Sequence, residues 1–109
     1  MAVTLWHNPR CSKSRATLAL LQDREIVVTV RDYQKQPPSV SELQDVLRKL
    51  GQPAGALMRW KDSDLAEGSS DTDILAALAT NPKLIERPVV ITENAARIGR
   101  PPEAVLEIV

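Results

Sequence analysis

The 109-residue sequence contains no phenylalanine, only one cysteine and only one histidine. Leu, Val, Ile and Ala must therefore fill most of the core, because Trp6, Trp60 and Tyr33 are the only aromatic residues. A single cysteine excludes a disulfide within the chain and a zinc site built from several cysteines. We therefore expect no metal site and no tightly bound cofactor.

Net charge is also absent, since 14 Lys and Arg residues balance 14 Asp and Glu residues. A general binder of nucleic acid or of anionic membranes would carry a basic excess, so neither class is expected. No apolar stretch approaches the ~20 residues that span a bilayer, and no signal peptide is visible. The length predicts a single domain over residues 1–109, and we expect a cytoplasmic monomer.

The most informative segment is His7-Asn8-Pro9-Arg10-Cys11-Ser12-Lys13-Ser14-Arg15, which joins a short apolar run to a helix-like run. The first N–H groups of a helix lack internal partners, and the helix dipole places partial positive charge there. A cysteine at such a position, with Arg10, Lys13 and Arg15 nearby, can have a lowered thiol pKa. Because a helix start also binds oxyanions, the segment predicts a nucleophilic Cys11 beside a bound anion.

Both unusual residues of this segment also have simpler interpretations. A lone cysteine in a small domain is often a buried hydrophobic residue, but Cys11 lies among polar and basic residues rather than in an apolar stripe. His7 could lower the thiol pKa as a charge partner, or it could simply hydrogen-bond the backbone. The spacing of four residues between His7 and Cys11 leaves these two roles open.

Hydrophobic patterning predicts an alternation of strands and helices along the chain. We expect strands at about 2–6, 26–30, 88–92 and 96–99, and helices at about 12–23, 39–50 and 70–79 and after residue 101. Ser39 and Glu42 have the spacing of a capping box at the start of the second helix, and Gly51 suits its end. The last helix should turn Val105, Leu106 and Val109 inward.

Strand directions follow from the connections. A helix between the first two strands favours a parallel pair, and the short turn at 93–95 favours an antiparallel pair. The mostly helical segment from about 37 to 84 is interpreted as an insert that packs over one end of the sheet.

Several motifs together resemble the glutaredoxin-dependent arsenate reductase family. His7-Asn8-Pro9, Cys11 and Ser14-Arg15 are similar to its active-site loop, and three further segments stand in the order that the family shows. These segments are Ala56-Leu57-Met58-Arg59, residues 81–90 and Arg97-Ile98-Gly99-Arg100-Pro101. The match covers nearly the whole chain and resembles the short branch of the family, which stops soon after the final helix.

The resemblance implies a fold as well as a site. The order β-α-β, helical insert, β-β-α is thioredoxin-like, an α/β fold with a mixed four-stranded sheet. Thioredoxin-like proteins place a cis-proline before the third strand, facing the cysteine, and Pro88 is the residue that the resemblance assigns to this structural role.

Arginines are the natural ligands of a tetrahedral oxyanion, because the planar guanidinium forms paired hydrogen bonds and keeps its charge. The resemblance implies that Arg59, Arg87 and Arg100 hold arsenate and arsenite, and each lies at the end of a predicted element, where side chains can converge. Arg15 is a further candidate ligand. Arg97 would point toward the site only if its strand stays regular, and we do not assign it.

The resemblance also implies a redox relay. The Cys11 thiolate would attack the arsenic of arsenate, His7 and Ser14 would favour the thiolate, and the arginines would neutralise the oxyanion. Reduction needs two electrons, and a chain with one cysteine cannot close an internal disulfide. Glutathione would therefore act as co-substrate, and glutaredoxin would resolve the resulting mixed disulfide.

Two other functions remain open at this point. Spx regulators share the fold and bind RNA polymerase without catalysing reduction, but many carry Cys-x-x-Cys where this chain has Cys11 and Ser14. A redox switch of that type is impossible here. Alternatively, a relative of the same fold could act on another oxyanion or on a glutathionylated thiol.

Overall fold

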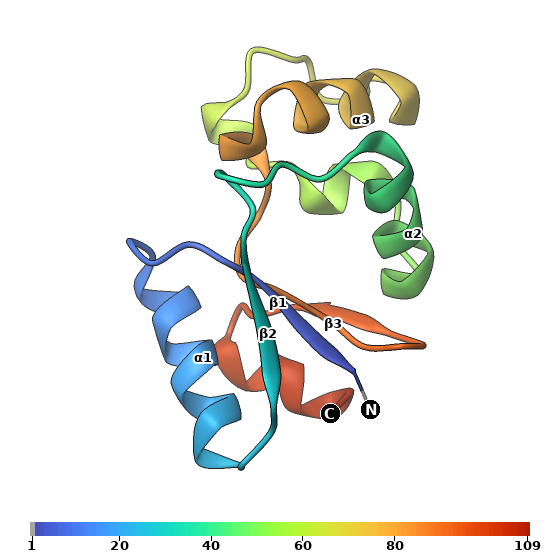
Figure 1. Cartoon of the computed structure of the whole chain (residues 1–109). Helices are drawn as coiled ribbons and strands as arrows, with labels where there is room; N and C mark the ends of the chain where they lie inside the picture. Colours follow the sequence, from blue (N-terminus) through green and yellow to red (C-terminus); the bar gives the residue numbers. More distant parts are fainter. Residues whose placement is uncertain (1) are drawn as a thin grey trace.

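Four strands form one mixed sheet in the computed structural model, which describes residues 2–109 (Figure 1). They are β1 (Val3–His7), β2 (Val28–Asp32), β3 (Val89–Ile91) and β4 (Ala96–Ile98), in the order β2-β1-β3-β4. β1 runs parallel to β2 and antiparallel to β3, and β3 runs antiparallel to β4. The predicted α/β fold with a mixed four-stranded sheet is confirmed.

The helices also follow the predicted order. The α-helices are α1 (Ser12–Asp23), α2 (Val40–Leu50) and α3 (Asp71–Thr80), and the 3-10 helices are η1 (Ala54–Leu57), η2 (Trp60–Asp62), η3 (Pro82–Leu84) and η4 (Pro102–Glu107). None of the helices within residues 2–109 is both long and apolar enough to cross a membrane.

Two predicted elements need correction. The second strand begins two residues later than expected, because the Ile26 N–H still donates to the carbonyl of Leu21 at the exit of α1. The last helix is η4, and Val105 and Val109 pack inward as expected. Ile108 joins them, whereas Leu106 is not part of that cluster. Side chains three residues apart eclipse in a 3-10 helix, which explains this change of face.

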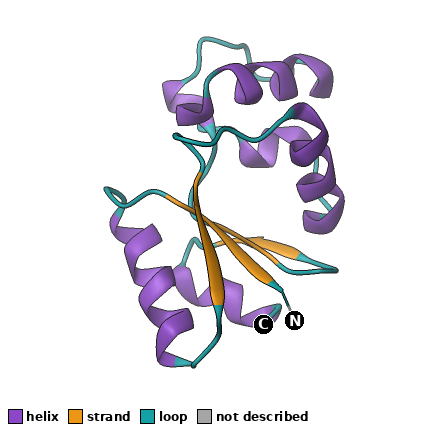
Figure 2. Cartoon of the chain, viewed as in Figure 1, coloured by secondary structure: helices purple, strands orange, loops and turns teal. Residues whose placement is uncertain are grey.

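The sheet separates two apolar clusters, because successive side chains of a strand point to opposite faces. On one face Val3 and Leu5 of β1 pack with Leu21 of α1 and Val105 of η4. On the other face Trp6 joins a larger cluster that includes the buried residues of α2 and α3. Figure 2 shows α1 and the C-terminal helix on one side of the sheet, away from α2 and α3.

The segment between β2 and β3 forms the expected helical insert beyond one end of the sheet (Figure 1). The capping box is present, since the Glu42 N–H donates to Ser39 Oγ and the Ser39 N–H donates to Glu42 Oε1, both at 3.1 Å. Gly51 ends α2 with a φ of 69°, a left-handed conformation that suits glycine. Lys49 Nζ, in the last turn of α2, donates to the carbonyl of Thr92 at 2.9 Å.

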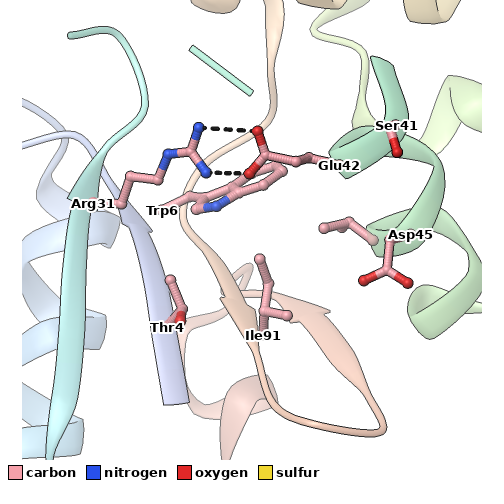
Figure 3. Close-up of a pocket in the computed structure, with 8 residues that line it drawn as sticks. Thr4, Trp6, Arg31, Ser41, Glu42, Asp45 and Ile91 are labelled. Atoms are coloured by element: carbon pink, nitrogen blue, oxygen red, sulfur yellow. Dashed lines mark hydrogen bonds and ion pairs between the residues drawn. The ribbon is translucent and has the colours of Figure 1, made fainter. Parts of the chain in front are cut away.

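A second connection links the insert to the sheet edge. The Arg31 guanidinium of β2 donates to both carboxylate oxygens of Glu42 in α2, at 2.5 and 3.3 Å, and lies 5.9 Å from the centre of the Trp6 ring (Figure 3). These groups border a pocket of about 330 Å³ between the sheet and α2. The guanidinium, aided by the Ser39 N–H, lowers the pKa of Glu42 to about 2.

Replacement of Glu42 tests this connection. Because the folded pKa of about 2 lies below the ordinary value of 4.5, the stabilisation is complete above pH 4.5 and is lost as the pH falls toward 2. The Glu42 side chain is 46% exposed, so water screens the pair. Glu42→Gln should therefore lower the free energy of unfolding by only about 1 kcal/mol at neutral pH. Urea unfolding at pH 7, 4 and 3 measures both effects.

The control for this experiment is Asp45→Asn, whose ion pairs with Arg48 and Lys49 lie within α2. It should change stability at neutral pH less than Glu42→Gln does. Equal unfolding midpoints for Glu42→Gln and the unmodified protein at every pH would show that the Arg31 connection does not stabilise the fold.

Candidate active site

Cys11 is the residue immediately before α1, as predicted, and its backbone is extended with φ −95° and ψ 123°. The loop that carries it is held by its own hydrogen bonds. The Cys11 N–H donates to the Asn8 carbonyl at 3.0 Å, and the Arg10 N–H donates to Asn8 Oδ1 at 3.0 Å. Cys11 is partly exposed, so its sulfur is accessible from solvent while the loop around it is ordered by hydrogen bonds.

The surroundings of the sulfur favour the thiolate. Burial raises the pKa of the Cys11 thiol, but the Ser14 N–H, the Arg87 guanidinium and the Lys13 N–H outweigh that cost and lower the pKa below its ordinary value. The two backbone groups belong to the first turn of α1, where N–H groups have no partner within the helix. Arg87 comes from the other half of the chain.

The His7 side chain contacts Ser14. Its Nδ1 and the Ser14 Oγ share a hydrogen bond of 2.7 Å, and the Asn8 N–H donates to the same Oγ at 3.0 Å. Burial lowers the pKa of His7, against a smaller opposing effect of Asp32, so the imidazole is neutral at neutral pH. The bond to Ser14 Oγ is neither a contact with the Cys11 sulfur nor the backbone hydrogen bond that the sequence allowed, and the role of His7 in the chemistry stays a prediction.

Arg87 is placed by the turn that precedes β3. The Arg87–Pro88 peptide bond is cis, as the resemblance implied. Gly99 lies against the ring of Pro88, and a Cβ atom at Gly99 would come within 2.7 Å of both Pro88 Cγ and Thr17 Oγ1. The Nε atom of Arg87 is buried and makes no hydrogen bond within residues 2–109. Arg87 also lines the open pocket described below, so the side chain can meet a ligand there.

The other two predicted arginines lie beside Arg87. Arg100 Nε donates to the Arg87 carbonyl at 2.9 Å. Arg59 is placed by a short antiparallel contact, in which its N–H donates to the Leu84 carbonyl at 2.8 Å and the Glu86 N–H donates to the Leu57 carbonyl at 2.7 Å. Three arginines that are distant in sequence thus gather at one end of the sheet.

Two carboxylates accompany these arginines, and sequence reasoning missed both. Asp62 accepts a hydrogen bond of 2.8 Å from Arg59 Nε. Glu86 lies between two guanidiniums, 3.7 Å from Arg59 Nη1 and 3.5 Å from Arg100 Nε. The only sequence signal was proximity, since Glu86 precedes Arg87 and Asp62 is three residues after Arg59.

Arg15 and Arg97 have different surroundings. Arg15 Nη1 donates to the Pro9 carbonyl at 2.9 Å, so its guanidinium stabilises the cysteine loop. Arg97 donates to the Ala96 carbonyl and pairs with Glu107 of η4 at 3.4 Å. Arg97 is therefore not gathered with the three arginines of the site.

An open pocket of about 460 Å³ lies between the cysteine loop and the insert. Its lining is mostly polar and includes the cations Arg10, Lys83 and Arg87 and the carboxylate of Asp62; Cys11, Arg59 and Arg100 are not part of the lining. Within residues 2–109, no three His, Cys, Asp or Glu side chains lie close enough together to hold a metal ion. Three cations against one carboxylate favour an anion in this pocket, which lies beside the loop that carries Cys11.

Known proteins resemble this chain over nearly its whole length. The sequence pattern of the ArsC family matches residues 6–108. The Escherichia coli K12 protein YfgD is 46% identical over 98% of this chain and 96% of its own length, and the arsenate reductase of Haemophilus influenzae is 43% identical over 99% of both chains. The solved structure of an arsenate reductase from Vibrio cholerae superposes with a TM-score of 0.92 at 45% identity, covering 100% of this chain and 98% of that one.

The pH dependence of Cys11 alkylation tests the electrostatics of the site. Iodoacetamide should react with an apparent pKa below the ordinary thiol value of 9.0. Arg87→Gln removes a positive charge beside the sulfur and should slow alkylation at neutral pH by about tenfold. His7→Ala should have a smaller effect, because its imidazole is neutral. Arg97→Gln is the control for lost charge outside the site. An unchanged pH profile in Arg87→Gln would contradict this assignment.

Proposed function

The chain belongs to the ArsC family, and from this premise we propose that it is an arsenate reductase, an oxidoreductase that converts arsenate to arsenite. Relatives that match it over nearly their whole length carry that name. The observation that carries the proposal is the position of Arg87, whose guanidinium lowers the pKa of the Cys11 thiol and whose side chain lines the open pocket beside the cysteine loop. One side chain can thus activate the nucleophile and bind the substrate.

In the proposed first step the Cys11 thiolate attacks the arsenic atom. A sulfur–arsenic bond forms, the bond from arsenic to a hydroxyl group of the substrate breaks, and that hydroxyl takes one proton from solvent and leaves as water. Arg59, Arg87 and Arg100 would hold the remaining oxygens, because guanidinium groups form paired hydrogen bonds with oxyanions and keep their charge. Ser14, fixed by His7, would keep the first turn of α1 aligned with the sulfur.

The second step requires a thiol from another molecule. Arsenate gains two electrons on becoming arsenite, and the chain has one cysteine. A glutathione thiolate would attack the adduct at the Cys11 sulfur, the electrons of the sulfur–arsenic bond would stay on arsenic, and arsenite would leave. The product is a mixed disulfide between Cys11 and glutathione. Glutaredoxin would then reduce it by thiol–disulfide exchange.

Arsenite formation, coupled to NADPH oxidation through glutathione reductase, tests the proposal. Arsenite should appear only when arsenate, glutathione and glutaredoxin are all present. Cys11→Ser should abolish turnover, because a serine hydroxyl without a dedicated base is a far weaker nucleophile. Arg87→Lys should lower kcat/KM by at least about tenfold because paired hydrogen bonding is lost. Arg97→Lys, outside the site, is the matched control.

Two results would contradict the proposed function. Robust turnover with thioredoxin alone would mean that the electron donor is wrong. A folded protein that forms no arsenite but binds RNA polymerase tightly would place the chain with the regulators that share its fold.

A further inference from the structure

Glu86 is an unusual residue for an anion site. Its carboxylate lies 3.7 Å from the Arg59 guanidinium and 3.5 Å from the Arg100 guanidinium, and 24% of its side chain is exposed. The adjacent residue, Arg87, lies beside the Cys11 sulfur. A negative charge therefore lies between two of the three arginines that would hold a doubly charged substrate.

Such a charge opposes anion binding unless the anion offers it a proton. A carboxylate can only accept hydrogen bonds, and it repels an oxygen that also only accepts them. Arsenate and phosphate keep at least one hydroxyl at neutral pH and can donate from it. Sulfate has the same tetrahedral shape but has no proton at that pH. One carboxylate can therefore separate the two kinds of oxyanion by hydrogen bonding.

We propose that Glu86 makes the site selective for tetrahedral oxyanions that carry a hydroxyl group, by accepting a hydrogen bond from that hydroxyl and repelling anions without one. The inference rests on the proposed function, since it concerns the same oxyanion site. It adds a specificity-determining residue whose charge is opposite to that of the other ligands.

The backbone holds Glu86 where this role requires it. Its N–H donates to the Leu57 carbonyl at 2.7 Å. An antiparallel β-bridge between Met58 and Ile85 holds the two backbone segments together next to this bond. The distances of 3.5 and 3.7 Å to the arginines exceed the 2.7–2.9 Å of a tight charge-assisted hydrogen bond. Glu86 therefore does not occupy all the N–H donors of either guanidinium, and both keep donors for a substrate.

Asp62 is less suited to this role. It accepts a hydrogen bond of 2.8 Å from Arg59 Nε, and its side chain is 47% exposed. Water screens a carboxylate that is half exposed, and its hydrogen bond already uses the Arg59 donor that faces it. Asp62 should therefore lower the affinity for every anion, while Glu86 should distinguish among them.

Calorimetric titration with inorganic phosphate and with sulfate tests the inference, because neither anion oxidises a thiol. The titrations use the full chain at neutral pH and constant ionic strength, so that salt screening is the same throughout. The unmodified protein should bind phosphate at least about tenfold more tightly than sulfate. In Glu86→Gln the ratio should approach one, mainly through tighter sulfate binding, because the amide can donate to sulfate.

Two further variants keep the test decisive. Asp62→Asn removes the other carboxylate of Arg59 and should strengthen binding of both anions without changing their ratio. Glu86→Ala removes the charge without adding a donor, and it should also raise sulfate affinity, so the inference is tested even if Glu86→Gln does not fold.

The outcomes separate this inference from the proposed function. Equal binding of phosphate and sulfate by the unmodified protein, or an equal change of ratio in Asp62→Asn and Glu86→Gln, would overturn the role of Glu86 and leave arsenate reduction standing. Failure of the unmodified protein to bind either anion would overturn the oxyanion site itself and the proposed function with it.

Discussion

The site depends on the proximity of the Arg87 guanidinium and the Cys11 sulfur, two groups from opposite halves of the chain. Burial alone would raise the pKa of the thiol, and Arg87 with two N–H groups of α1 reverses that effect. The sheet creates this proximity, because β1 and β3 are antiparallel neighbours. The C-terminal end of β1 and the N-terminal end of β3 therefore lie at the same end of the sheet. The loop before α1 and the turn before β3 therefore both lie at that end of the sheet.

The charges of the site are balanced rather than uniformly positive. Arg59 and Arg100 are accompanied by the carboxylates of Asp62 and Glu86, while the Nε of Arg87 has no hydrogen-bond partner within residues 2–109. An unpaired cluster of three guanidiniums would oppose folding through mutual repulsion. The carboxylates reduce that repulsion, and the proposed role of Glu86 gives one of them a second use in substrate selection.

Much of the fold could be predicted from sequence because its signals are local. The capping box at Ser39 and Glu42 and the parallel pair around α1 depend on residues close in sequence, and they are confirmed. The site was harder, since the neutral state of His7 follows from burial, and the pairing of Glu86 with Arg59 and Arg100 follows from tertiary contacts. The 3-10 geometry of η4 was also missed, because prolines at its start suit either kind of helix.

The central claim is that the nucleophile and the oxyanion site are one place, joined by Arg87. The most direct test is the rate of Cys11 alkylation by iodoacetamide at increasing arsenate concentration, without glutathione. The account predicts a saturable decrease of the rate in the unmodified protein and a much weaker decrease in Arg87→Gln. A rate that stays constant at every arsenate concentration would contradict it.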